Sequence, residues 1–298
     1  MQVLESAGFK QARTLISEAS RVLILTGAGV SAESGIPTFR GAGGLWRQYQ
    51  ATDLATPQAF RNDPSLVWEF YHYRRDLVSK CEPNPAHLAI AAFQKKAASV
   101  GRIVTVVTQN IDRLHQAAGA RKVIELHGSL WLVKRETEAG FVEESGKVWE
   151  DRNNPICPAL EGKGSPEVGT HGQVPLKELP HVVEENGRLS LLRPAVVWFG
   201  EGLDPLTLGA VEAELELCDL MIVAGTSSVV YPAAGFAPIV AARGAPIIEV
   251  NLESTAGTTM CTVGLQGKAG EILPALLGVE DEVQELRTAV SGNSHTVR

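Results

Sequence analysis

Two glycine-rich turns in this sequence have the residue types that bind phosphate. G-A-G at 27–29 follows the short apolar run VLILT, and G-T-S at 225–227 follows a second apolar run, LMIVA. A glycine turn between a buried strand and a helix exposes backbone N–H groups that can receive phosphate oxygens. We expect the helix after the first turn to begin near Ser31. Tight packing also favours glycine at strand ends, so G-A-G alone leaves phosphate binding and packing equally open.

Polar side chains follow two further apolar runs. Gln109, Asn110 and Asp112 come after RIVTVVT, and Asn251 and Glu253 come after PIIEV. The carboxamide of nicotinamide needs one donor and one acceptor, and a carboxylate beside a ribose suits NAD rather than NADP. For any single member of the first group, hydrogen bonding within a loop is an equally good interpretation.

Three other side chains have the chemistry to act on a substrate. His127 ends the run VIELHG, and an imidazole has the pKa to take a proton from a ribose hydroxyl near neutral pH. Tyr71 and Arg74 are three residues apart, so on a helix they share a face and can clamp a carboxylate. From the residues alone, a polar loop histidine, a packing aromatic and a solvated arginine are favoured instead. His115 is interpreted as structural.

The elements that position these residues follow from the apolar runs. Strands are expected near residues 22, 103, 123, 195, 220 and 247, with helices between most of them. This pattern predicts the α/β class, with a Rossmann-like doubly wound parallel sheet. Right-handed crossovers bring the carboxyl ends of parallel strands to one edge, where the two glycine turns, 109–112, His127 and 251–253 are expected to meet.

Changes in composition and in hydrophobic periodicity along the sequence predict how the chain divides into domains. A large NAD-binding domain is expected from 1–40, 82–128 and 191–280, and a small domain from a helical insertion at 41–81 and an irregular insertion at 129–190. The tail at 281–298 is expected to be frayed. Breaks at Gly35, Pro37 and 41–44 are unlike an ordinary dinucleotide-binding helix and predict a loop that covers a ligand.

Composition excludes several classes of protein. The chain has 298 residues, 44% of them hydrophobic, and a net charge of −7, which argues against a dedicated nucleic-acid or anionic membrane surface. The longest apolar runs are of strand length, far short of the ~20 residues of a membrane span. Four scattered cysteines form no C-x-x-C pair and indicate a reducing compartment.

The N-terminal segment shows no targeting signal. It lacks the long apolar region of a secretory peptide, and Glu5 and Glu18 interrupt any mitochondrial presequence. We therefore expect a cytoplasmic or nuclear location, with a mitochondrial one left open, and a monomer.

Five motifs, TGAGVSAESGIPTFRG, TQNIDRLH, ELHGS, GTSS and VNLE, resemble in order and spacing those of the sirtuin family of NAD-dependent protein deacylases, over about residues 21–277. The chain looks most like the class III members, which remove acidic acyl groups, because ATDLATPQAF begins at Ala51 and Tyr71 and Arg74 match the acyl-selecting positions. The resemblance makes His127 the general base. It assigns NAD binding to Gly27, Ala28, Gly29, Ala32, Phe39, Arg40, Gln109, Asn110, Asp112, Gly225, Thr226, Ser227, Asn251, Glu253 and Ala269. It assigns substrate binding to Ala51, Tyr71, Arg74, Val197, Trp198, Phe199 and Gly200, the last four as a cleft where an acyl-lysine peptide adds as a strand.

The reaction that this resemblance implies consumes NAD. The acyl-lysine amide oxygen attacks the nicotinamide ribose, and His127 then deprotonates a ribose hydroxyl, giving free lysine, nicotinamide and O-acyl-ADP-ribose. Succinyl, malonyl or glutaryl lysine is the expected substrate. A weak deacetylase, a mono-ADP-ribosyltransferase and a non-catalytic reader of acyl-lysine or ADP-ribose stay open, although a reader needs no base.

The chain departs from the family at the zinc site. Sirtuins usually hold a structural zinc with two cysteine pairs, whereas the matching places here read KRETEAG and HVVEENGRLS. Cys157, His171 and His181 have the wrong spacing for a tetrahedral site. We expect no zinc.

Overall fold

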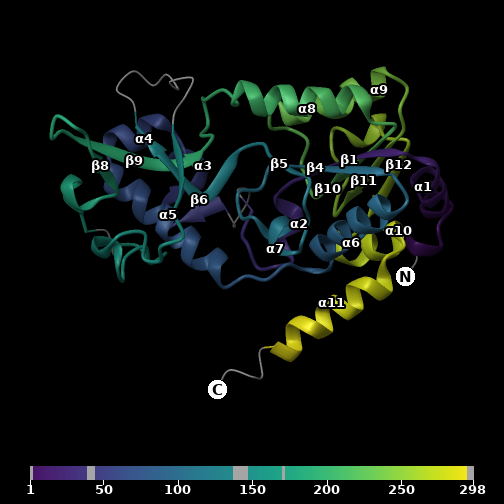
Figure 1. Cartoon of the computed structure of the whole chain (residues 1–298), viewed down its shortest axis with the longest axis horizontal. Coiled ribbons are helices and arrows are strands. Elements are labelled where there is room, and N and C mark those ends of the chain that lie inside the picture. The colour runs from purple at the N-terminus through teal and green to yellow at the C-terminus, as the bar shows by residue number, and fades with distance from the viewer. Residues whose placement is uncertain (1–2, 39–43, 137–146, 170–171, 294–298) are drawn as a thin grey trace. The chain divides into compact units, whose positions relative to one another are not determined.

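The computed structural model describes residues 3–38, 44–136, 147–169 and 172–293, and the chain divides into two compact units (Figure 1). Unit 1 comprises Met1–Gly35, Glu82–Leu126 and Asp204–Arg298. Unit 2 comprises Ile36–Cys81 and His127–Leu203. Within the described residues, no helix is long and apolar enough to cross a membrane.

Unit 1 is built on a six-stranded parallel sheet with the strand order β12-β11-β10-β1-β4-β5. The strands are β1 (Arg21–Thr26), β4 (Ile103–Thr108), β5 (Val123–Glu125), β10 (Leu220–Ala224), β11 (Ile247–Asn251) and β12 (Val263–Gln266). β4 and β10 lie on opposite sides of β1, so the order of connections reverses there. In open α/β sheets, ligands bind beyond the carboxyl ends of the strands at such a reversal.

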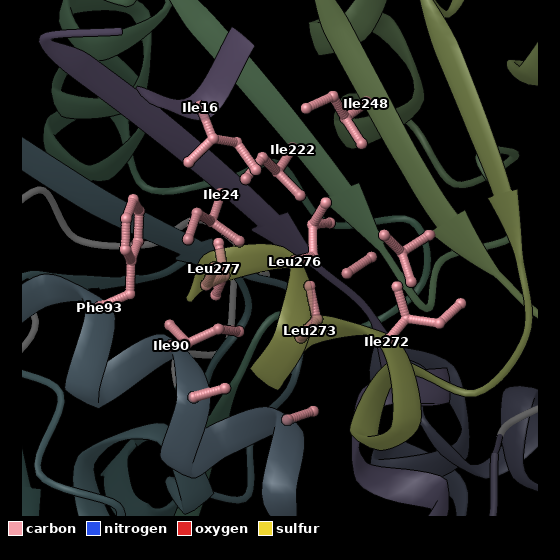
Figure 2. Close-up of a cluster of buried hydrophobic side chains, with 14 of the residues drawn as sticks. Ile16, Ile24, Ile90, Phe93, Ile222, Ile248, Ile272, Leu273, Leu276 and Leu277 are labelled. Atoms are coloured by element: carbon pink, nitrogen blue, oxygen red, sulfur yellow. The ribbon is translucent and has the colours of Figure 1, made fainter. Parts of the chain in front are cut away.

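Helices cover both faces of this sheet (Figure 1). On one face lie α1 (Ala7–Glu18), α6 (Pro85–Ser99), α10 (Ala269–Leu277) and α11 (Glu280–Asn293); on the other lie α8 (Pro205–Leu217) and α9 (Phe236–Ala242). Figure 2 shows Ile24, Ile222 and Ile248 of the sheet meeting Leu273 and Leu276 of α10 in the core. Truncating one such leucine to alanine typically costs about 2–5 kcal/mol.

Unit 2 pairs a four-stranded antiparallel sheet, β7-β6-β9-β8, with a helical segment. Its elements are the hairpin β2 (Leu45–Trp46) and β3 (Tyr49–Gln50), the helices α3 (Ala51–Leu54), α4 (Pro57–Asn62) and α5 (Pro64–Ser79), and the strands β6 (Gly128–Arg135), β7 (Val148–Glu150), β8 (His181–Val183) and β9 (Leu189–Val196). Asp63 caps α5 by accepting a hydrogen bond from Leu66 N at 2.9 Å, and Pro64 occupies its first position. Polar as well as apolar residues of α5 are buried, which marks it as the centre of the unit.

The doubly wound α/β class is confirmed, but two expectations about its elements are wrong. The strand expected near residue 195 is β9, which belongs to the antiparallel sheet of unit 2, and the sixth parallel strand is β12. β12 is an edge strand buried at alternate positions only, so it lacks the continuous apolar run of a central strand. Residues Glu280–Asn293 form α11 where a frayed tail was expected, and the acidic residues at 280–282 favour its N-terminus.

Candidate active site

The two predicted glycine turns of unit 1 pack directly on each other. Gly29 N donates a hydrogen bond to Gly225 O at 2.8 Å. Gly225 has a positive φ of 58°, and a Cβ added there would lie 2.4 Å from Val30 N. Close packing of backbone against backbone therefore requires glycine at both turns, as the packing interpretation held. Helix α2 (Ala28–Ala32) begins at Ala28 rather than near Ser31, and it is only five residues long.

Side chains from the ends of two strands, β4 and β11, converge on these turns. Gln109 Nε2 donates to Thr226 Oγ1 at 3.0 Å, and Asn251 Nδ2 donates to Thr226 O at 2.8 Å. Asn110 Nδ2 donates to Gly27 O at 3.0 Å. The structure thus brings together members of the four polar groups that lie in unit 1.

Asp112 is fixed by a buried set of polar groups. Ser31 Oγ donates to Asp112 Oδ2 at 2.7 Å and accepts from Asn110 Nδ2 at 3.0 Å. His87 Nε2 lies 3.3 Å from the same Ser31 oxygen, and His87 Nδ1 accepts from Asn84 N at 3.3 Å. Because Nδ1 is an acceptor, the hydrogen of the neutral imidazole is on Nε2 and points at Ser31. The serine hydroxyl is therefore left to donate to the carboxylate.

The second buried histidine of unit 1, His115, is neutral as well. Its Nε2 lies 2.9 Å from Thr26 Oγ1, which donates to Thr108 Oγ1 at 2.9 Å. Burial lowers the pKa of His115 to about 4, and burial with the nearby His115 ring holds the pKa of His87 well below its usual value. Near neutral pH the predicted nicotinamide side of the site is thus supported by two uncharged imidazoles, in line with the structural interpretation of His115.

The remaining predicted NAD-binding residues differ in their surroundings. Ala28 and Ser227 are half-buried, Ala32 and Glu253 are exposed, and Ala269 is buried at the start of α10. Phe39 and Arg40 lie outside the described residues.

One buried acid beside the predicted ribose site was not predicted from the sequence. Glu249 in β11 is 3% exposed and accepts hydrogen bonds from the hydroxyl groups of Thr255 and Thr258, the first at 2.5 Å. It thereby fixes the loop that follows Asn251. The signal was present in the sequence, because a single acid inside the apolar run PIIEV needs a partner.

Unit 2 contains a cavity of about 230 Å³. It is lined by Pro37, Leu45, Trp46, Ala51, Phe70, Tyr73, Arg74, Leu77 and Val78. Of these described lining residues, Arg74 is the one that carries a charge. Two predicted acyl-site residues, Ala51 and Arg74, thus reach the same cavity.

Tyr71 lies on α5, three residues before Arg74, and is buried. Its hydroxyl oxygen accepts a hydrogen bond from Trp198 Nε1 at 2.8 Å. Burial raises the pKa of Tyr71 to about 12, although the hydrogen bond from Trp198 and the positive charge of Arg74 act in the opposite direction. The phenol is therefore protonated throughout the physiological range.

His127 belongs to unit 2, in the link between β5 and β6. β5 ends at Glu125, so the strand is shorter than the expected VIELHG. The His127 carbonyl oxygen accepts from Val197 N at 3.0 Å, and the ring is half-buried. Gly128 has a φ of 76°, and a Cβ there would lie 2.1 Å from Ala195 O, which explains the H-G pair.

The predicted peptide cleft at 197–200 is not uniform. Trp198 is 2% exposed, whereas Phe199 is 44% exposed and Gly200 is exposed with a φ of 88°. The Trp198 side chain is thus part of the interior of unit 2.

Known proteins are similar to this chain in sequence and in fold. The chain matches the model of the Sir2 family over residues 27–232. It is 54% identical over 270 residues to the NAD-dependent protein deacylase sirtuin-5, mitochondrial, of Xenopus tropicalis, covering 90% of this chain and 85% of that protein. It is 54% identical over 273 residues to the protein of that name from Canis lupus familiaris, covering 91% and 86%. A solved Sir2 homolog–NAD complex matches with a TM-score of 0.72 at 40% identity, covering 94% of each chain. The chain belongs to the Sir2 family.

The names of these relatives contradict the expected cytoplasmic or nuclear location, because both are called mitochondrial. That expectation rested on Glu5 and Glu18. In the structure, Glu18 ends α1, a helix that buries Phe9, Ala12 and Ile16 in unit 1. The charges of this segment therefore belong to a folded surface and are no guide to targeting.

The places where sirtuins usually hold zinc carry other contacts here. Glu136 Oε2 pairs with Arg193 Nη1 at 3.5 Å, Glu184 Oε1 with Arg135 Nη1 at 3.6 Å, and His181 Nδ1 lies 2.8 Å from a backbone oxygen. In the part of the chain that the structure describes, no three His, Cys, Asp or Glu side chains are placed to hold a metal ion. These donors do not fit a structural zinc, and a zinc-free unit 2 stays a prediction.

Proposed function

We propose that this chain is an NAD-dependent protein-lysine deacylase that removes acidic acyl groups, namely succinyl, malonyl and glutaryl, from lysine. The deacylase activity is supported by membership of the Sir2 family and by relatives that are named NAD-dependent protein deacylases. The acidic preference is supported by one observation: Arg74 is the charged group in the described lining of a cavity that is otherwise apolar or aromatic. A volume of about 230 Å³ is several times that of one water molecule, ~30 Å³.

Arg74 is suited to an acyl carboxylate because its guanidinium donates several hydrogen bonds in a fixed plane. In surroundings of low polarity the attraction between opposite charges is stronger than in water. Ala51 adds space for the acyl chain. An acetyl group has no carboxylate, so Arg74 offers it no matched partner.

The polar edge of unit 1 supplies the groups that would hold NAD. When bound, NAD would supply the reaction with a ribose carbon from which nicotinamide can leave. The packed glycine turns suit the phosphates, Asn110 and Asp112 suit the carboxamide, and Asn251 and Glu253 suit a ribose. His127 is the proposed base that takes a proton from a ribose hydroxyl, since imidazole is the side chain suited to proton transfer near neutral pH. We also infer that the partners are acyl-lysine proteins or peptides and that the chain acts as a monomer.

The test follows nicotinamide release from NAD with two peptides that differ only in a succinyl or an acetyl group on one lysine. We expect kcat/KM to be higher for the succinyl peptide. Replacing Arg74→Met removes a charge-assisted hydrogen bond and should lower kcat/KM for succinyl about 30-fold while leaving acetyl turnover nearly unchanged. Arg61→Met, at an exposed position of α4, is the matched control.

Each outcome bears on a separate part of the proposal. Absence of nicotinamide release with both peptides would contradict the enzyme. Preferential turnover of the acetyl peptide would contradict the acidic preference. An equal loss on both peptides in Arg74→Met would reassign this arginine to a structural role.

A further inference from the structure

The hydroxyl group of Tyr71 accepts one hydrogen bond, and its own hydrogen is available to donate another. Trp198 Nε1 donates to the Tyr71 oxygen at 2.8 Å, and an indole N–H is a donor only. Within the described part of the chain, the Tyr71 hydroxyl donates no hydrogen bond. A phenol can donate as well as accept, so its hydrogen is available to an acceptor that arrives with a ligand.

A carboxylate is the acceptor that suits this hydrogen. With a pKa raised to about 12, the Tyr71 phenol is neutral at the pH of the reaction and does not repel an anion. Arg74 stands three residues along the same helix, and its charge acts on the phenol. A protonated phenol and a guanidinium on one helix face therefore present donors to the same anion.

Trp198 is itself rigidly held. The Arg193 guanidinium carbon stands 3.3 Å from the centre of the Trp198 ring, and Arg193 forms a two-pronged ion pair with Glu201 at 2.6 and 2.9 Å. Glu201 Oε2 also accepts from Trp198 N at 2.9 Å. The Phe60 ring packs at 5.4 Å from the indole. The indole N–H thus has a fixed direction, and the phenol oxygen is bound to it.

We propose that Trp198 is a positioning residue for acyl selectivity: its indole N–H orients the Tyr71 hydroxyl so that the phenol donates its hydrogen to the acyl carboxylate bound by Arg74. This inference rests on the proposed deacylase function and adds a residue that does not touch the substrate. It also separates Trp198 from Phe199, whose exposed side chain remains the candidate for peptide contact.

Trp198→Phe tests the proposal because it keeps an aromatic ring beside Arg193 and Phe60 but removes the N–H. We expect kcat/KM for the succinyl peptide to fall about fivefold more than kcat/KM for the acetyl peptide, so that the ratio of the two changes. In a Tyr71→Phe background, which lacks the hydroxyl, the same change should cause no further selective loss. Such non-additivity identifies two residues that act through one interaction.

Trp68→Phe is the matched control. Trp68 is equally buried, lies on the same helix as Tyr71, and donates its indole N–H to Leu192 O at 3.1 Å. It should leave the ratio of succinyl to acetyl turnover unchanged. If Trp198→Phe does not fold, Tyr71→Phe serves as the test, because we expect it too to lower turnover of the succinyl peptide selectively.

Wild-type turnover of the two peptides tests the deacylase function, and the variants test Trp198. The inference is overturned if Trp198→Phe leaves the succinyl-to-acetyl ratio unchanged, if it lowers both activities equally, or if Trp68→Phe shifts the ratio as much. An equal loss on both peptides in Tyr71→Phe would overturn it as well.

Discussion

The polar edge of unit 1 and the proposed acyl cavity of unit 2, which Arg74 lines, are held in place by different kinds of interaction. In unit 1, Gln109, Asn110 and Asn251 reach the glycine turns through hydrogen bonds between uncharged groups. In unit 2, the cavity wall is fixed by a buried ion pair between Arg47 and Glu69 at 2.7 Å, with side chains 2% and 0% exposed. Uncharged hydrogen bonds can be lost one at a time at about 1 kcal/mol each, whereas a broken buried ion pair leaves a charge without water. We therefore expect single substitutions to destabilise unit 1 and unit 2 by different amounts.

The Arg47 side chain links three parts of unit 2. Besides Glu69 on α5, its Nε donates to Ser165 O at 2.9 Å, and its guanidinium carbon lies 4.1 Å from the centre of the Trp46 ring. Trp46 lines the cavity and packs edge-on against Phe70 at 5.5 Å. Arg47 thus links Trp46, which lines the cavity, to α5, the helix that carries Arg74.

The largest effect is expected from Arg47→Met. The change leaves Glu69 buried without its charged partner and should lower the free energy of unfolding by about 3–5 kcal/mol, measured by urea denaturation. The double variant Arg47→Met/Glu69→Leu should recover most of this loss, because no charge remains buried. Arg152→Met, in an ion pair with Glu150 whose side chains are more than half exposed, is the control and should change stability by less than about 1 kcal/mol. A loss in Arg47→Met no larger than in the control would remove the contrast between the two units.

An intermediate effect is expected from Gly225→Ala in unit 1. Because the added methyl group would lie 2.4 Å from Val30 N, the two turns must separate, at about 1–3 kcal/mol of stability, and the KM for NAD should rise at least about tenfold. Gly209→Ala in α8 is the control, since its position is open and alanine stabilises a helix by up to about 1 kcal/mol. Titration with NAD and urea denaturation measure both quantities. Normal NAD binding in Gly225→Ala would show that the packed turns are not part of the NAD site.

The same difference explains what the sequence could reveal. The polar edge of unit 1 was predicted residue by residue, because each group directly follows a strand and parallel strands end at one edge. The burial of Glu249 was not predicted, because Thr255 and Thr258 reach its carboxylate only when the following loop folds back. The strand near residue 195 contains Arg193 and Pro194, which are unusual in a central parallel strand, but nothing local in it identifies an antiparallel partner about 60 residues earlier in the chain.

The acyl cavity was less predictable. The helical spacing of Tyr71 and Arg74 was visible, but the groups that fix them come from distant segments. The Tyr71 partner, Trp198, is 127 residues away, and the ion pair of Arg47 joins residue types that are usually exposed. Only tertiary structure decides that these charges and this indole are buried together.

The smallest expected effect concerns His115, one of the two buried neutral histidines beside the polar edge of unit 1. Burial lowers the pKa of His115 to about 4 in the folded chain from the ordinary histidine value of 6.5, so the unfolded chain binds the extra proton first as pH falls. Stability from this group is complete above pH 6.5 and is lost between pH 6.5 and about 4, amounting to about 1 kcal/mol between pH 7.5 and 5.5. His115→Gln cannot titrate but retains a donor near Thr26, so its stability should fall by about 1 kcal/mol less than that of the wild type over this range. Urea denaturation at both pH values measures the difference. Parallel pH dependence in the two proteins would mean that burial does not hold His115 neutral in the folded chain.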